Sequence, residues 1–124
     1  MPIPPQYQTV MPYLIVEGAE KFSNFTQAVF GEVEQLRVPR SPGVIMHAEI
    51  NIGGSTIMFA DATEQYPPRP AGMFIYVQDA DETYARALRE GATVISPMAD
   101  QPYGRSGGVM DPFGNSWWIT SVPK

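Results

Sequence analysis

Apolar residues recur at offsets of three and four in two stretches of this chain, about sixty residues apart, which predicts two amphipathic helices. The first set is Ala19, Phe22, Phe25, Val29 and Phe30, and the second set is Ala80, Tyr84, Ala87 and Leu88. Gly31 and Gly91 follow these sets as the residues that end the helices. A short apolar run precedes each helix, at residues 11–16 and 73–77, and predicts a buried strand.

Three strand-like stretches follow each predicted helix. They cover residues 33–38, 44–52 and 56–60 in the first half, and residues 93–96, 107–110 and 116–120 in the second. Turn residues separate the last two strands of each half, namely Gly53-Gly54 and the segment 111–114. We therefore expect an α+β protein of two βαβββ modules within a single domain, residues 1–124. Module 1 covers about residues 8–61, a proline-rich linker about 62–70, and module 2 about 71–121.

The composition of this 13.7 kDa chain excludes several classes of site and partner. The sequence contains no cysteine, which excludes a disulfide framework, a thiolate metal centre and a cysteine nucleophile. Its net charge is -5 and its basic residues are scattered, so we do not expect nucleic acid as a partner. No signal-like segment opens the chain, and no apolar run is long enough to cross a bilayer. We expect a cytoplasmic protein without a membrane partner.

The last predicted turn and strand carry a motif, Asp-Pro-Phe-Gly-Asn-Ser-Trp-Trp-Ile-Thr at residues 111–120. Together with the doubled βαβββ module, this motif resembles the vicinal oxygen chelate superfamily of glyoxalases, bleomycin resistance proteins and dioxygenases, over about residues 8–121. The segment 46–61, Met-His-Ala-Glu-Ile-Asn-Ile-Gly-Gly-Ser-Thr-Ile-Met-Phe-Ala-Asp, is similar to the PhnB-like branch. The resemblance implies the glyoxalase/bleomycin resistance/dihydroxybiphenyl dioxygenase-like fold, a cavity shared by the two modules, a small-molecule ligand and a homodimer.

Members of this superfamily that bind a metal hold it with side chains from the first and last strand of each module. The resemblance places four residues at those positions: Met11, Met58, Gly72 and Trp118. A hard divalent cation needs imidazole or carboxylate ligands, which thioether, glycine and indole do not provide. We therefore expect no metal and no other cofactor, while a divalent metal held in an atypical way stays an alternative.

His47 and Glu49 are the candidate catalytic residues. They lie two positions apart on a predicted strand, so their side chains face the same side of the sheet. A histidine beside a carboxylate can transfer protons near neutral pH or hydrogen-bond a polar ligand. The alternative is a structural pair within a sheet or at an interface between modules or subunits.

The candidate ligand-binding residues are Met11, Met58, Tyr103, Arg105 and Trp118. The two methionines and the tryptophan would make an apolar, polarizable floor for an aromatic or unsaturated ligand, or would simply fill the core. Arg105 could hold an anion in a bidentate grip, or bond loop carbonyls or Asp111. Tyr103 could close over the ligand from the same loop, or lie exposed. We interpret Asp111 and Gly114 as turn residues.

The sequence thus predicts a protein that binds a small molecule without the usual divalent metal. One alternative is a metal-dependent lyase, isomerase or dioxygenase, in which His47 and Glu49 would need further ligands from a partner subunit, from Asp61 or Asp100, or from water. Another alternative is a resistance protein that sequesters an antibiotic. The sequence leaves open whether the protein is an enzyme.

Overall fold

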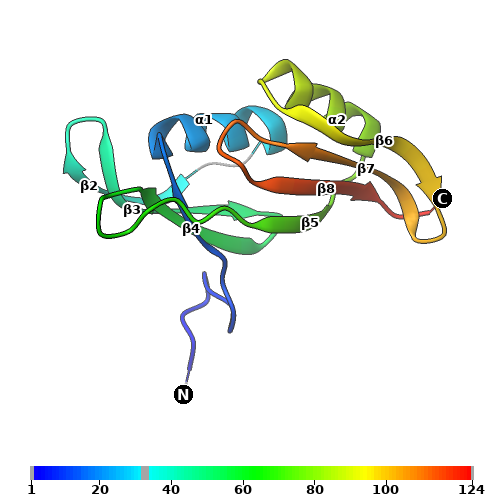
Figure 1. Cartoon of the computed structure of the whole chain (residues 1–124). Helices are drawn as coiled ribbons and strands as arrows, with labels where there is room; N and C mark the ends of the chain where they lie inside the picture. Colours follow the sequence, from blue (N-terminus) through cyan, green and yellow to red (C-terminus); the bar gives the residue numbers. More distant parts are fainter. Residues whose placement is uncertain (1, 32–33, 124) are drawn as a thin grey trace. The chain divides into compact units, whose positions relative to one another are not determined.

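The computed structural model describes residues 2–31 and 34–123 of the chain (Figure 1). The chain divides into two compact units, Met1–Arg69 and Pro70–Lys124, and the boundary lies in the proline-rich stretch expected to link the modules. The single domain and the shared cavity expected from the sequence stay predictions.

The N-terminal unit is one βαβββ module. Its elements are β1 (Tyr13–Val16), α1 (Ala19–Phe30), β2 (Glu34–Ser41), β3 (Val44–Ile52) and β4 (Ser55–Asp61). The strands form one sheet in the order β1-β4-β3-β2, in which β1 is parallel to β4 and the other pairs are antiparallel. Figure 1 shows α1 over one face of this sheet and the segment that precedes β1 on the other side.

The C-terminal unit repeats this topology. Its elements are β5 (Gly72–Tyr76), α2 (Ala80–Arg89), β6 (Thr93–Gln101), β7 (Gly104–Met110) and β8 (Ser116–Ser121). Its sheet has the order β5-β8-β7-β6, again with one parallel pair, β5 and β8. The α+β class and the two βαβββ modules are therefore confirmed.

Each core lies between a helix and the sheet face that the helix covers, because side chains on successive strand residues alternate between the two faces. In the N-terminal unit the buried side chains include Leu14, Val16, Phe22, Val29, Ile50 and Phe59. In the C-terminal unit they include Ala80, Ala87, Val109, Trp117 and Ile119. The helix does not cover the opposite face of each sheet.

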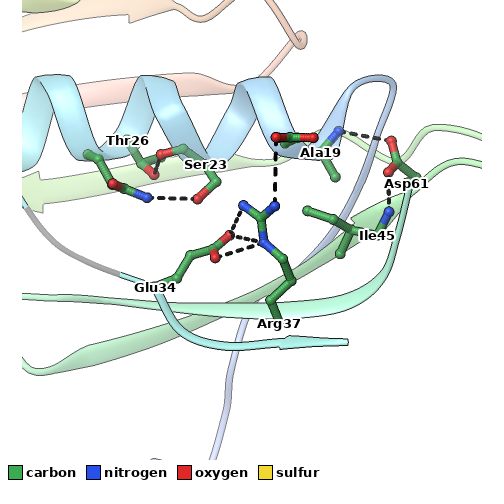
Figure 2. Close-up of polar contacts among 9 residues, drawn as sticks. Ala19, Ser23, Thr26, Glu34, Arg37, Ile45 and Asp61 are labelled. Carbon is green, nitrogen blue, oxygen red and sulfur yellow. Dashed lines mark hydrogen bonds and ion pairs between the residues drawn. The ribbon is translucent and has the colours of Figure 1, made fainter. Parts of the chain in front are cut away.

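Asp61, at the end of β4, caps α1 from outside the helix. Gly18 precedes the helix and has no side chain to cap it. Asp61 Oδ1 instead accepts from the backbone N–H groups of Ala19 (2.9 Å) and Gly18 (3.2 Å), and its Oδ2 accepts from the N–H of Ile45 (2.6 Å). Figure 2 shows Asp61 between Ala19 and Ile45. One carboxylate thus ties α1, β3 and β4 together while it neutralises the positive end of the helix dipole.

Four strands differ from the sequence-based expectation by two residues or more at one end. The first begins at Tyr13 rather than residue 11, since the ring of Pro12 leaves no N–H for pairing. The second extends to Ser41, and Val33, expected at its start, lies outside the described residues. The sixth continues through Pro97 to Gln101, because it is an edge strand whose register shifts between Ser96 and Ala99 accommodate the proline.

The seventh strand, expected at residues 107–110, starts three residues earlier than predicted. Strand β7 begins at Gly104, so Arg105 lies within the sheet and only Pro102 and Tyr103 separate β6 from β7. Glycines at these positions are compatible with a strand where another group approaches the backbone closely, and periodicity alone does not reveal such an approach. Within the described residues, no helix is long and apolar enough to cross a membrane.

Candidate functional site

The face of the N-terminal sheet that α1 leaves uncovered carries a polar cluster. Tyr13 on β1 lies beside Met58 on β4, and Met58 lies beside Glu49 on β3. Side chains of directly paired residues stand on the same face of a sheet. The expectation that His47 and Glu49 face the same side is confirmed, because His47 Nε2 lies 2.8 Å from Glu49 Oε2.

Four polar side chains form one chain of hydrogen bonds on this face. The Tyr13 hydroxyl lies 3.0 Å from His47 Nδ1, and the two rings are tilted against each other with centroids 5.5 Å apart. The Tyr7 hydroxyl lies 2.8 Å and 2.9 Å from the two carboxylate oxygens of Glu49. Tyr13 is 47% exposed, whereas the Glu49 side chain is only 3% exposed. The cluster therefore runs from an exposed phenol to a buried carboxylate.

The buried Glu49 is held in its ionised form. Burial acts to raise the pKa of this carboxyl group, but hydrogen bonds from His47, Tyr7 and Gln35 outweigh it and leave the pKa lowered. The Tyr7 hydroxyl, in turn, has a raised pKa, because it donates its proton to the carboxylate. Burial, and then the negative charge of Glu49, raises the pKa of Tyr13. Both phenols accordingly stay protonated near neutral pH.

Tyr7, Tyr13 and Gln35 were not identified from the sequence as parts of this cluster. Tyr7 lies in the segment before β1, which is pinned to β4 by two bonds between the Gln8 side chain and the backbone of Thr56 (2.9 and 3.1 Å). Forty-two residues separate Tyr7 from Glu49. The only signal for Tyr13 is the alternation along β1, which puts it on the opposite face from Leu14.

The uncovered face of the C-terminal sheet is aromatic instead. Phe74 on β5 lies beside Trp118 on β8 in parallel register. The Phe74 ring also lies 5.2 Å from the ring of Tyr76 and 6.1 Å from that of Tyr103, measured between centroids. These four residues, which we call the aromatic face, are between 38% and 60% exposed. By contrast, Trp117 on the helix side of β8 is 1% exposed.

Gly108 makes room for the indole of Trp118. It pairs with Trp118 across β7 and β8. A Cβ atom at this position would overlap the six-membered ring of the indole and would lie 2.5 Å from its Cε3 atom, closer than van der Waals contact permits. The indole of Trp118 therefore lies across the backbone of β7 at Gly108, while the residue as a whole is 38% exposed.

Arg105 lies on the helix side of β7. Its guanidinium group donates two bonds of 3.2 Å to Asp81 in the first turn of α2 and one of 3.4 Å to Asp100 on β6. The hydrogen bond to Asp81 is the main cause of its raised pKa. Two carboxylates thus neutralise the guanidinium. The expected grip of Arg105 on an anionic ligand stays a prediction.

The turn role assigned to Asp111 is confirmed. Its Oδ1 accepts from the backbone N–H groups of Phe113 and Asn115, both at 2.9 Å. Its Oδ2 accepts from the Asn115 side chain at 2.9 Å and from the indole N–H of Trp117 at 2.8 Å. The carboxylate is buried, so it holds the turn and the first residues of β8 in place. Its bond to Trp117 was not anticipated from the sequence.

The side chains at the four metal-ligand positions of the superfamily do not fit a divalent metal. Met58 supplies a thioether, Gly72 has no side chain, Trp118 lies over Gly108, and Met11 precedes β1. Asp61 caps α1 and Asp100 pairs with Arg105, so both alternative donors already have partners. Within residues 2–31 and 34–123, no three or more histidine, cysteine, aspartate or glutamate side chains form a group that could hold a metal ion.

Comparison with known proteins agrees with the fold. An uncharacterized protein of Mycobacterium bovis, Mb0911c, is 36% identical over 118 residues, which span 86% of this chain and 78% of that protein. The crystal structure of TioX from a Micromonospora species has a TM-score of 0.76 at 27% identity, over 94% of this chain and all of TioX. TnmS3 of a Streptomyces species, described as an antibiotic binding protein, has a TM-score of 0.72 at 19% identity, over 94% of this chain and 100% of TnmS3.

The similarity to the PhnB-like branch also has a structural counterpart. A PhnB protein of Bacillus cereus has the same fold, with a TM-score of 0.69 at 22% identity over 93% of this chain and 100% of that chain. The family model described as "Glyoxalase/Bleomycin resistance protein/Dioxygenase superfamily" matches residues 8–119, which make up most of both units. The chain belongs to the glyoxalase/bleomycin resistance protein/dioxygenase superfamily.

Proposed function

We propose that this protein binds a small, flat aromatic molecule on the aromatic face of its C-terminal unit, without a divalent metal. One observation supports this most directly: the indole of Trp118 lies across Gly108 and beside Phe74, whose exposed ring in turn contacts the rings of Tyr76 and Tyr103. Exposed apolar patches on a protein surface commonly serve binding. The shared cavity expected from the resemblance stays part of the proposal.

Stacking explains why these residue types suit such a ligand. Offset or edge-on contact between two aromatic groups adds about 0.5–1.5 kcal/mol to the free energy gained from burying their area. A ligand that covers Trp118 and touches Phe74 would gain free energy both from the area it buries and from stacking. Because the indole already occupies the space that a side chain at position 108 would fill, little reorganisation would be needed before the ligand binds.

The experiment is calorimetric titration with flat aromatic antibiotics. Bleomycin, which carries a flat bithiazole, is the first compound, and fosfomycin, which has no aromatic ring, is its counterpart. Antibiotics come first because TnmS3, a solved neighbour in fold, is described as an antibiotic binding protein. We expect Trp118→Ala to weaken binding about tenfold through the loss of stacking.

Tyr66→Ala is the matched control, because Tyr66 is an exposed aromatic residue in the N-terminal unit, outside the aromatic face. It should bind as the wild type does. Equal affinities of the wild type and Trp118→Ala would refute the proposal, as would the failure of every flat compound to bind at millimolar concentration.

Sequestration of an antibiotic and enzymatic turnover can be separated with the same compounds. A bacterium that expresses the protein should survive exposure to a bound drug while the drug stays chemically intact if the protein sequesters it. Disappearance of the drug would instead favour an enzyme. For the metal-dependent lyase, isomerase or dioxygenase, elemental analysis of protein never exposed to chelator is decisive. Near-stoichiometric metal that is lost in His47→Ala would replace our proposal.

We also propose that the protein forms a homodimer, since symmetric dimers are the commonest assembly of soluble homo-oligomers. Light scattering coupled to size exclusion should then give twice the chain mass of 13.7 kDa. A mass equal to one chain across the micromolar range would reject this assembly.

A further inference from the structure

We infer that Tyr13, His47 and Glu49 form a proton-accepting site, which binds a ligand through a weakly acidic hydroxyl group, such as that of a phenol or an enol, and takes its proton. This inference concerns the N-terminal unit and goes beyond the proposed aromatic binding, which rests on residues of the C-terminal unit. It can therefore hold or fail separately.

The direction of the hydrogen bonds follows from the chemistry of Glu49. An ionised carboxylate only accepts hydrogen bonds, so the proton between His47 and Glu49 belongs to His47 Nε2, at 2.8 Å. In neutral imidazole the other nitrogen then carries the lone pair. We assign this neutral ring to the free protein, in which His47 Nδ1 accepts from the Tyr13 hydroxyl at 3.0 Å.

The outer end of this chain is accessible and its inner end is not. Tyr13 is 47% exposed, and its oxygen, having donated its proton to His47, has lone pairs left to accept from a ligand. At the inner end, Glu49 is buried and bonded by Tyr7 and by Gln35, whose Nε2 lies 3.3 Å from Oε1. In the part of the chain that the structure describes, Tyr7, Gln35, His47 and Tyr13 are the polar groups that interact with Glu49.

The proton transfer balances in charge and atoms. The ligand O–H bonds to Tyr13 Oη, the Tyr13 proton passes to His47 Nδ1, and the ligand proton replaces it on Tyr13. The electron pair of the broken O–H bond stays on the ligand oxygen. The imidazolium that forms lies against the Glu49 carboxylate, which offsets its charge, as a carboxylate does for histidine in other acid–base sites.

The fold of the module does not itself require this cluster. In the C-terminal unit the sheet has the same order and register type, yet Phe74 takes the place of Tyr13 beside the last strand, and Gly108 takes the place of Glu49. A second module therefore builds the same sheet without an ionisable pair. A buried carboxylate also carries a desolvation cost that an apolar residue at this position would avoid.

The first measurement is the protonation state of His47, which is the only histidine of the chain, so that imidazole ¹⁵N signals need no assignment. Long-range ¹H–¹⁵N spectra of the labelled full chain should show a neutral ring protonated at Nε2, with Nδ1 as an acceptor. A ring protonated at Nδ1 would overturn the inference, because Tyr13 could then no longer donate to it.

The second measurement uses 4-cyanophenol, which stays protonated in neutral solution and whose phenolate has a distinct ultraviolet band. On binding near neutral pH, the phenolate band should appear and the His47 signals should move to those of imidazolium. Tyr13→Phe and Glu49→Gln should each lower the phenolate signal at saturating probe by about tenfold or more. Binding of the phenol in its neutral form, or no binding at millimolar probe, would contradict the inference.

Controls separate proton transfer from a structural role. Tyr66→Phe removes a phenol outside the cluster and should leave both signals unchanged. If Glu49→Gln fails to fold, Tyr13→Phe still tests the inference, because its ring is retained and half exposed. A merely structural cluster would lose stability in these variants without any change in the phenolate band. A loss of affinity in Trp118→Ala tests the proposed function. The ionisation of the probe and of His47 tests the proton-accepting site.

Discussion

The indole of Trp118 lies across Gly108, its partner on the neighbouring strand. Glycine is required at this position for space rather than for an unusual backbone angle, because any side chain would overlap the ring. The position of the Trp118 indole thus depends on the absence of a side chain at Gly108.

Gly108→Ala should push Trp118 off the sheet. We expect the substitution to cost about 1–3 kcal/mol of unfolding free energy, as overpacking does, and to change the tryptophan emission. Urea unfolding followed by fluorescence measures both. Gly72→Ala is the matched control in the same sheet, because a Cβ there meets no atom of the described residues within 4 Å. Equal stability of the two variants would mean that the indole is not held in this position.

Asp111→Ala should be strongly destabilising, because the buried carboxylate accepts from the indole of Trp117 and from Asn115. Leaving such donors unpaired costs about 3 kcal/mol. Asp100→Ala, which removes a carboxylate whose side chain is 89% exposed, should cost far less. The unfolding midpoints in urea compare the two. Similar midpoints would show that water replaces the Asp111 bonds.

Asp61→Ala should loosen the start of α1, because three backbone N–H groups lose their acceptor. The expected cost is about 1–2 kcal/mol, the upper range for a lost helix cap. Amide exchange should accelerate first at Ala19 and Ile45. Asp61→Asn keeps one acceptor oxygen and should lose less. Unchanged exchange at Ala19 would contradict the capping role.

Stability should depend on pH through Glu49. The folded state lowers the pKa of this carboxyl group below its usual value of about 4.3. Its contribution is therefore complete above that value and is lost as pH falls through the folded-state pKa. Below about pH 5, the unfolding free energy of the wild type should fall more steeply than that of Glu49→Gln. Parallel pH profiles would show that Glu49 has the same pKa folded and unfolded.

Much of this architecture could be predicted from local pattern. The spacing of Phe22, Phe25 and Val29 predicts α1, and alternation places His47 and Glu49 on one side of β3, because both periods are properties of the backbone. Strand ends were less predictable. The extension of β6 through Pro97 depends on its position at a sheet edge, which no local pattern reveals.

The sequence alone determined the two βαβββ modules and, through the motif it shares with the family, the superfamily. These follow from short-range periodicity, from turn residues and from a motif within ten consecutive residues. Only the tertiary structure decided the hydrogen-bond partners of Glu49 and the position of the Trp118 indole across Gly108. Tyr13 lies 34 residues from His47, and Tyr7 lies 42 from Glu49, so their contacts arise from strand register and chain path. Such long-range contacts depend on the whole sheet, because register sets which side chains meet.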